Sequence, residues 1–213
     1  MGNDHWPLFD LEVRTPRLTL RYLDDTLTGE LLAVARRGVH DPAVMPFTIP
    51  WTDLPSPQME QEAMRYYARA RAEVRPAHWS LQFAVVVDGD VIGACDVMAS
   101  EFVALRQVTT GSWLGREFQG RGLGKEMRMA ALTLAFDGLG AEFALTGLWH
   151  DNEASLGVTR SLGYVEEGRR RELRRGVPDE IVGFRMPRSH WATIRRNDIE
   201  LHAVESARSL LDL

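Results

Sequence analysis

Several features that define other classes of protein are scarce or missing in this chain of 213 residues. It contains one cysteine, Cys95, which excludes a disulfide framework and a cysteine-based zinc site. No apolar run approaches the roughly 18 residues that a membrane-spanning helix needs. Residues 1–16 hold acidic and aromatic side chains where a signal peptide has a basic start and an apolar stretch. These absences predict a cytoplasmic protein with no membrane partner.

Positive charge is also in short supply. Lys and Arg number 25 against 30 Asp and Glu, a net charge of −5, and Lys125 is the only lysine. A general nucleic-acid binder usually carries a basic face, so we expect no nucleic-acid partner. The six histidines show no metal-binding spacing such as H-E-x-x-H, and we therefore predict no metal site.

Hydrophobic periodicity predicts alternating strands and helices. Strands are expected at residues 18–22, 79–87, 91–99, 107–116, 142–149, 170–174 and 180–186, with a short extension at residues 164–166. Helices are expected at residues 28–37, 57–75, 125–139 and 152–162, and in a tail from residue 189 onward. Ser56-Pro57 is interpreted as the N-cap and first residue of the second helix. This order predicts a single α/β (α+β) domain with a mixed, mostly antiparallel sheet flanked by helices.

A loop rich in proline and aromatic residues joins the first two predicted helices. It carries Met45, Phe47 and Trp51 between prolines at positions 42, 46, 50 and 55. Long loops of this kind often line binding sites. We expect Phe47 and Trp51 to form one wall of a substrate pocket, and the alternative is that they fill the core between the two helices.

A glycine-rich segment carries the clearest chemistry. The predicted strand through Leu114 runs into the turn Gln119-Gly120-Arg121-Gly122-Leu123-Gly124, which opens a long helix. Such a turn directs several backbone N–H groups inward, and the helix N-terminus adds about half a positive charge. Arg121 and Lys125 add two cationic side chains. The segment therefore fits a pyrophosphate.

Two familiar phosphate loops do not match this segment. A Walker loop needs Ser or Thr after its lysine, but Glu126 follows Lys125. The dinucleotide fingerprint G-x-G-x-x-G belongs to a βαβ unit, whereas Gly120, Gly122 and Gly124 recur at every second position. Glycine richness alone leaves open a nucleotide-dependent oxidoreductase and a helix entry that binds nothing.

Three motifs in the right order resemble those of the GNAT acyltransferase superfamily, in its RimJ/RimL-like branch. The turn at residues 119–124 matches the Q/R-x-x-G-x-G/A signature. Residues 152–155 and 161–164 resemble the N-x-x-S … L-G-F/Y ending, and residues 15–21 resemble the T-x-R-L-x-L-R opening strand. The resemblance covers residues 12–190, which we expect to form the acyltransferase domain. Residues 191–213 are expected to form a helical tail that packs on the body or on a partner subunit.

The resemblance implies an N-acyltransferase that uses acetyl-CoA or another short acyl-CoA such as succinyl-CoA. It implies that the central parallel strands splay apart, that the pantetheine arm lies between them, and that the Leu114 N–H faces the thioester carbonyl. An oriented donor of this kind stabilises the developing oxyanion. The residues that the resemblance places at the CoA are Leu114, Gln119, Gly120, Arg121, Gly122, Leu123, Gly124, Lys125, Asn152 and Ser155.

The sequence departs from the family at one catalytic position. Many members carry a tyrosine in the last core helix that protonates the leaving thiolate, and alignment from Asn152 places Thr159 there. Ser155 is the nearest substitute, unless it only serves the first turn of its helix. His150 is either a base or a polar strand end. The basic run at residues 169–175 is either a solvated hairpin or a site that attracts the adenosine 3′-phosphate or an acidic acceptor.

Acid–base arithmetic bounds the acceptor. An α-amino group has a pKa of about 7.7–8.0 and a lysine amine about 10.4. Near pH 7.5, roughly a third of the former but only about one in a thousand of the latter is neutral. Without an obvious strong base, the motifs favour a protein N-terminus or a small amine, attacking directly in a ternary complex. The missing tyrosine leaves a second hypothesis open, a non-catalytic acyl-CoA-binding regulatory module, and the tail leaves room for a homodimer.

Overall fold

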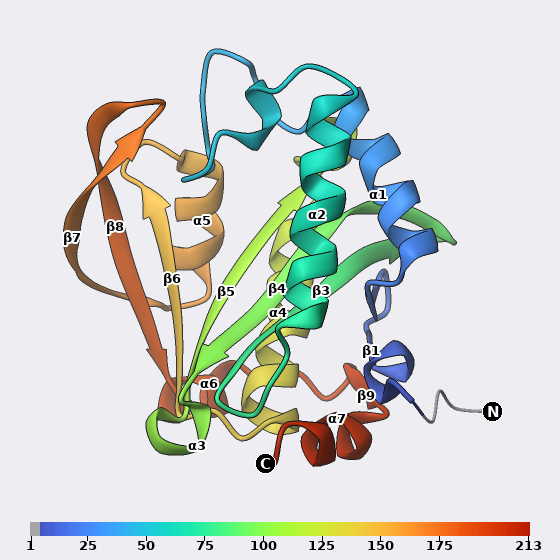
Figure 1. Cartoon of the computed structure of the whole chain (residues 1–213). Coiled ribbons are helices and arrows are strands. Elements are labelled where there is room, and N and C mark those ends of the chain that lie inside the picture. The colour runs from blue at the N-terminus through green and yellow to red at the C-terminus, as the bar shows by residue number, and fades with distance from the viewer. Residues whose placement is uncertain (1–4) are drawn as a thin grey trace.

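One sheet of nine strands forms the centre of the computed structural model, which describes residues 5–213 (Figure 1). The strand order is β7-β8-β6-β5-β4-β3-β2-β1-β9, and every neighbouring pair is antiparallel except β5 and β6. The strands are β1 (Glu12–Arg14), β2 (Thr19–Tyr22), β3 (His78–Val87), β4 (Asp90–Ser100), β5 (Gln107–Leu114), β6 (Phe143–Trp149), β7 (Val165–Arg174), β8 (Val177–Pro187) and β9 (Glu200–His202). The predicted fold class is confirmed.

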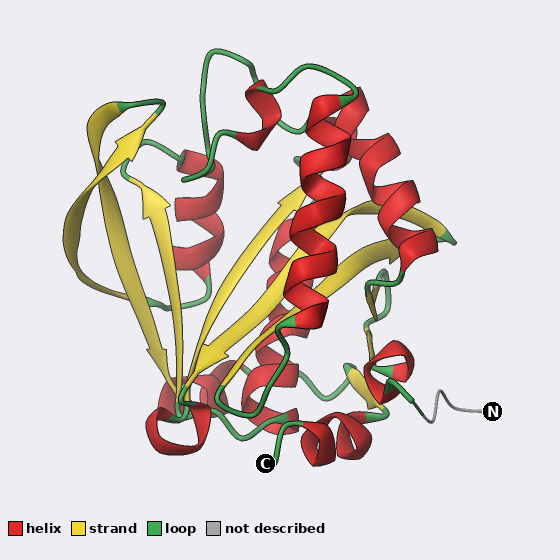
Figure 2. Cartoon of the chain, viewed as in Figure 1, coloured by secondary structure: helices red, strands yellow, loops and turns green. Residues whose placement is uncertain are grey.

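Helices cover both faces of this sheet, as Figure 2 shows. The face under α1 and α2 is called the α1–α2 face here, and the opposite one, under α4 and α5, is called the α4 face. The helices are α1 (Asp25–Arg37), α2 (Gln58–Ala72), α3 (Phe102–Leu105), α4 (Leu123–Thr133), α5 (Glu153–Ser161), α6 (Arg188–Ile194) and α7 (Val204–Leu210). No helix of the described residues is long and apolar enough to cross a membrane.

The parallel strands β5 and β6 separate along their length. Only three residue pairs join them, from Gln107 opposite Phe143 to Thr109 opposite Leu145. Beyond this point β5 continues to Leu114 beside β4 alone, and β6 continues to Trp149 beside β8 alone. The two strands therefore form a V that opens at their carboxyl ends (Figure 1). The splayed parallel pair expected from the resemblance is confirmed.

The largest core cluster lies on the α4 face. Helix α4 supplies an almost wholly apolar run, from Met127 to Leu132, that packs against the inward side chains of β2 to β6. A π-helical turn at Leu134–Gly138 then carries the chain toward β6. On the α1–α2 face, Leu27, Leu31 and Val34 of α1 pack against β3 and β4. The core therefore holds the middle of the sheet from both sides.

Some local predictions need correction. Ser56 does not cap α2, which begins at Gln58 without a side-chain cap, because the Ser56 hydroxyl donates to Glu60 Oε1 at 2.7 Å instead. Helix α1 begins at Asp25, earlier than expected, because the Asp24 carboxylate accepts from Leu27 N at 2.7 Å. The two last predicted strands are longer than expected and form one hairpin, β7–β8.

The C-terminal segment contains more than helices. Strand β9 pairs with β1 at the edge of the sheet, and both strands have only three residues. Ala207 and Leu211 are fully buried in the same core cluster as α4. Residues 188–213 therefore complete the sheet edge and the core of the same chain.

Candidate active site

The end of β5 presents backbone groups to the open V. Gly115 N donates to Ile92 O of β4 at 2.9 Å, and alternation along an antiparallel ladder then turns the N–H and C=O of Leu114 away from β4. The Leu114 carbonyl accepts from Gln119 Nε2 at 2.8 Å, which agrees with that direction. The Leu114 N–H consequently points toward the space from which β6 has diverged.

Two glycines shape the turn that enters α4. Gly120 and Gly122 have φ angles of 74° and 77°, a left-handed conformation that other residues adopt only with strain. Gly122 is the N-cap of α4 and offers no side-chain acceptor, so the first backbone N–H groups of the helix are left for another partner. A Cβ at Gly120 would meet no atom within 4 Å, so the turn is open on that side.

Cationic side chains flank the turn. Arg121 is exposed, lies over the Phe118 ring, and donates to Glu117 O at 2.8 Å. Lys125 is exposed in the first turn of α4, with its ammonium 3.4 Å from Ser161 O of α5. Together with the helix N-terminus they make this turn electropositive in a chain whose net charge is −5.

The Gln119 side chain holds the turn in place. Its Nε2 donates to Val39 O at 2.7 Å, just after α1, and to Leu114 O at 2.8 Å. One amide group thus ties the glycine-rich turn to both β5 and the end of α1. Since Gln119 Nε2 is already engaged with two carbonyls, a contact between this residue and CoA would use its other groups.

A buried carboxylate fastens the first turn of α4 to the opening motif of the chain. Glu126 is 5% exposed and accepts from Arg17 Nε at 2.6 Å and Thr15 Oγ1 at 2.7 Å. Burial alone would raise the pKa of Glu126, but the hydrogen bonds from Thr15 and Arg17 outweigh it and hold the pKa below its ordinary value. Arg17 also donates to Arg121 O at 3.2 Å. Sequence reasoning missed this clamp, although the arginine of the opening motif was a signal for it.

Polar groups line β5 on the α4 face. Arg128 is 4% exposed and donates to Thr110 Oγ1 at 2.8 Å and Ser112 Oγ at 3.3 Å, both beyond the last β5–β6 pair. Tyr164 is buried, with its hydroxyl near Arg128 and Thr110 but without a well-formed hydrogen bond. Burial raises the pKa of Tyr164. Sequence reasoning missed this arginine, because it lies within an apolar helix.

Helix α5 begins at the open end of the V. Asn152 is its N-cap, and Asn152 Oδ1 accepts from Ser155 N at 3.2 Å. Ser155 is half-buried in the first turn, while Thr159 is buried one turn further on with no hydrogen-bond partner for its hydroxyl. Because β5 and β6 are parallel, the N-terminus of α5, which follows β6, lies at the same edge as Leu114.

The aromatic loop closes this edge on the α1–α2 face. The Phe47 and Trp51 rings are 5.3 Å apart, and Trp51 is 5.7 Å from Trp113, which precedes Leu114 on β5. Phe47 and Trp51 are half-buried, whereas Met45 is 2% exposed and belongs to the core. Trp149 at the end of β6 donates to Phe47 O at 3.2 Å. The loop therefore reaches from α1 to both arms of the V.

The remaining sequence candidates are His150, which directly follows β6, and the basic run of the β7–β8 hairpin. His150 Nε2 is 3.7 Å from Asp179 Oδ1, with a side chain 41% exposed. The basic run is largely paired: Arg169, Arg170, Arg174 and Arg175 each form ion pairs with carboxylates. This pairing weakens the run as an anion site. The described residues contain no cluster of three or more His, Cys, Asp or Glu that could hold a metal ion.

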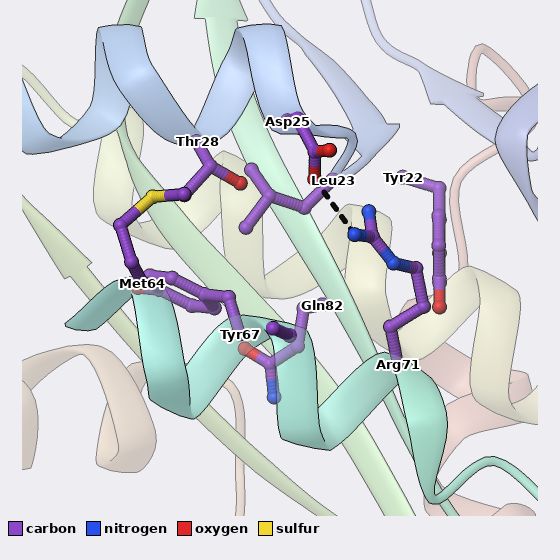
Figure 3. Close-up of a pocket in the computed structure, with 9 residues that line it drawn as sticks. Tyr22, Leu23, Asp25, Thr28, Met64, Tyr67, Arg71 and Gln82 are labelled. Atoms are coloured by element: carbon purple, nitrogen blue, oxygen red, sulfur yellow. Dashed lines mark hydrogen bonds and ion pairs between the residues drawn. The ribbon is translucent and has the colours of Figure 1, made fainter. Parts of the chain in front are cut away.

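A small pocket lies apart from the V, between α1 and α2 (Figure 3). The ion pair between Arg71 and Asp25, 2.7 Å long, closes one side, and Tyr67 and Gln82 line it from α2 and β3. None of its lining residues comes from β5, the glycine-rich turn or α5. It is therefore a separate feature from the candidate active site.

A splayed parallel pair beside a glycine-rich helix entry defines an acyltransferase-type site, and comparison with known proteins gives the family. The family model described as "Acetyltransferase (GNAT) domain" matches residues 17–165. The chain belongs to the GNAT acetyltransferases, an enzyme family, as its motifs predicted.

Solved structures share this fold. A GCN5-related N-acetyltransferase from Brucella melitensis has a TM-score of 0.68 at 21% identity, over 85% of this chain and 80% of that chain. The RimL ribosomal L7/L12 alpha-N-protein acetyltransferase in complex with coenzyme A has a TM-score of 0.67 at 16% identity, over 81% and 95%. A spermidine N-acetyltransferase SpeG chimera from Vibrio cholerae and hSSAT has a TM-score of 0.65 at 20% identity, over 83% and 98%.

Proposed function

We propose that this protein transfers a short acyl group, acetyl or one such as succinyl, from acyl-CoA to a primary amine by direct attack in a ternary complex. The observation that carries the proposal is the free edge of β5, where the Leu114 N–H points into the V just before the uncapped start of α4. When bound, acyl-CoA supplies an activated thioester carbonyl.

The glycine-rich turn fits the pyrophosphate of CoA. Gly120 leaves the backbone uncovered and Gly122 brings no side-chain cap, and the first N–H groups of α4, with Arg121 and Lys125, provide donors and positive charge. Gln119 fixes the turn against β5, and the Arg17–Glu126 pair fixes it against the segment between β1 and β2, without using the open side. Leu123 and Gly124 contribute backbone groups in the first turn, and Asn152 sets the start of α5.

Two groups act on the reacting atoms in this proposal. The Leu114 N–H donates a hydrogen bond to the carbonyl oxygen as negative charge develops on it. The Ser155 hydroxyl gives a proton to the sulfur as the thiolate leaves. Ser155 is assigned this role because Thr159 occupies the position at which many family members carry a tyrosine. The amide of Asn152 holds the backbone of Ser155 in position.

The acceptor approaches across the α1–α2 face, beside Phe47, Trp51 and Trp113. These rings form an apolar wall next to Leu114. The named activities of the neighbours, one on a protein α-amine and one on spermidine, support a protein N-terminus or a small amine as the acceptor. The acid–base arithmetic favours the amine of lower pKa.

The test combines calorimetry with a thiol-release assay on the purified chain. We expect CoA to bind and NAD not to bind, and free thiol to appear from acetyl-CoA or succinyl-CoA only when an amine is added. CoA binding without amine-dependent thiol release across a panel of α-amines and polyamines would favour the regulatory module. Absence of CoA binding would refute the proposal.

A further inference from the structure

One carboxylate interrupts the apolar pattern of β4. Asp96 lies on the α1–α2 face, between Ala94 and Met98, and its neighbours across the sheet are Gln82 of β3 and Gly111 of β5. It is half-buried. Removing a carboxylate from water costs free energy, so a carboxylate in the middle of a sheet is expected to have hydrogen-bond partners or a functional role.

The Asp96 carboxylate lies over β5 at Gly111, where the absence of a side chain leaves space for it. Asp96 Oδ1 accepts from Gly111 N at 2.6 Å. A Cβ at Gly111 would lie 2.9 Å from Asp96 Oδ1 and 3.1 Å from Oδ2, so any other residue would push the carboxylate away. Trp113, the next residue of β5 on this face, belongs to the aromatic wall. Asp96 and that wall therefore lie in line along β5.

The surroundings of Asp96 disfavour the ionised form of its carboxyl group, so the carboxylate accepts a proton more readily than a carboxylate in water. Burial raises the pKa of Asp96 to about 6, against smaller lowering effects from the Gly111 N–H and from Arg128 on the α4 face. The other titratable groups near it are Tyr66 and Tyr67 of α2 and the buried Cys95 thiol, and the pKa of each is raised. Asp96 is the group among these whose charge changes just below neutral pH.

We propose that Asp96 accepts the proton which the acceptor amine must lose before it attacks. The inference rests on the proposed function. Leu114 N lies three residues beyond Gly111, about 10 Å along the strand. In this proposal a short chain of water molecules carries the proton from an amine at the carbonyl carbon held at Leu114 to the partly exposed Asp96 carboxylate.

The acceptor enters as R–NH₃⁺ and passes one proton through water to Asp96, which frees the nitrogen lone pair. The N–C bond forms with that pair, and the C–S bond breaks with its electrons going to sulfur. The nitrogen sheds a second proton, equivalent to the one that sulfur gains as CoA–SH. Asp96 returns its proton to solvent, so the sum is amide, free thiol and one H⁺.

The decisive variant is Asp96→Asn, whose amide oxygen can still accept from Gly111 N. With an amine of pKa near 8, of which about a tenth is neutral at pH 7, we expect kcat/KM for the amine to fall about tenfold at that pH. The loss of activity relative to the unchanged protein should shrink as the pH rises to 9, because most of the amine is then already neutral when it binds. The KM for acyl-CoA should not change. Asp90→Asn at the exposed start of the same strand is the matched control.

Two further measurements separate a base from a structural residue. A ¹³C NMR titration of the carboxyl groups should show one resonance, absent in Asp96→Asn, with a midpoint near 6. If Asp96→Asn does not fold, Gly111→Ala takes its place. This variant retains the Asp96 carboxyl group but moves it away from β5, and it should show the same pH-dependent loss of activity. A loss below threefold, a deficit independent of pH, or a midpoint near 4 would overturn the proposal for Asp96. Since the unmutated enzyme would remain active in each case, those outcomes differ from failure of the proposed function, in which no amine is acylated.

Discussion

Replacing Gly124 by Asp offers a sharp test of the phosphate site, since stability and binding are expected to move in different directions. Gly124 is the second residue of α4, and a Cβ there would touch only Val158 Cγ2 at 4.0 Å. A helical Gly costs roughly 0.5–1 kcal/mol relative to Ala, and an acidic residue in a first turn gains about 0.3–1 kcal/mol. The melting temperature should therefore stay the same or rise.

Binding of CoA should weaken strongly in the same variant. A carboxylate about 5 Å from a phosphate charge, at an effective dielectric constant near 40, is repelled by about 1.7 kcal/mol. Two pyrophosphate charges give about 3 kcal/mol, which corresponds to a loss of about 10²-fold in affinity. Isothermal titration calorimetry with CoA measures this loss directly.

Two controls complete the experiment. Gly124→Ala adds the Cβ without the charge and should lose far less affinity. Gly157→Asp makes the same change on an exposed helical glycine of α5, where a Cβ meets no atom within 4 Å. If folded Gly124→Asp binds CoA within threefold of the unchanged protein, the pyrophosphate does not lie at this helix start.

Three other predictions follow from the site. Ser155→Ala should lower kcat by about 10²-fold with little change in KM for acyl-CoA if its hydroxyl protonates the thiolate, and a change below threefold in steady-state assays would show that it serves only the helix. Trp51→Ala should raise the KM for the acceptor and leave the affinity for CoA unchanged. If urea unfolding instead shows that the variant loses about 3 kcal/mol or more of stability while its kinetics are unchanged, Trp51 is a core residue. Asp96→Asn should stabilise the fold at pH 7.5 by at most about 3 kcal/mol, from a folded pKa of about 6 against 3.8. Because the raised pKa disfavours only the ionised form, this gain should disappear below pH 4, and a gain independent of pH would contradict the shift.

Much of the fold was predictable because its longer elements carry clear periodicity. The apolar spacing of α4 and the long apolar stretches of β3 and β4, which are joined by a short turn, are strong signals over ten residues or more. Strands β1 and β9 have three residues each, too few for alternation to show, and they are held by pairing, β9 with β1 and β1 also with β2. The splay of β5 and β6 came from family resemblance, since no local pattern encodes it.

The candidate site was predictable where the chain is contiguous. The glycine-rich turn is one stretch of sequence, and its glycines occupy left-handed positions as such turns require. The Arg17–Glu126 clamp joins residues 109 apart, and Asp96 meets Gly111 across two strands. Neither pair of residues forms a recognisable spacing pattern in the sequence, so each contact becomes visible only in the folded structure.

The most direct test of acyl transfer at this site is a product analysis by mass spectrometry. The protein is incubated with acetyl-CoA labelled with ¹³C in its acetyl group and with a primary amine of pKa near 8, and labelled amide and free CoA thiol are counted together. We predict one labelled amide per thiol, and loss of both in Gly124→Asp. Thiol without amide, or undiminished amide formation in Gly124→Asp, would contradict acyl transfer from a donor held at the start of α4.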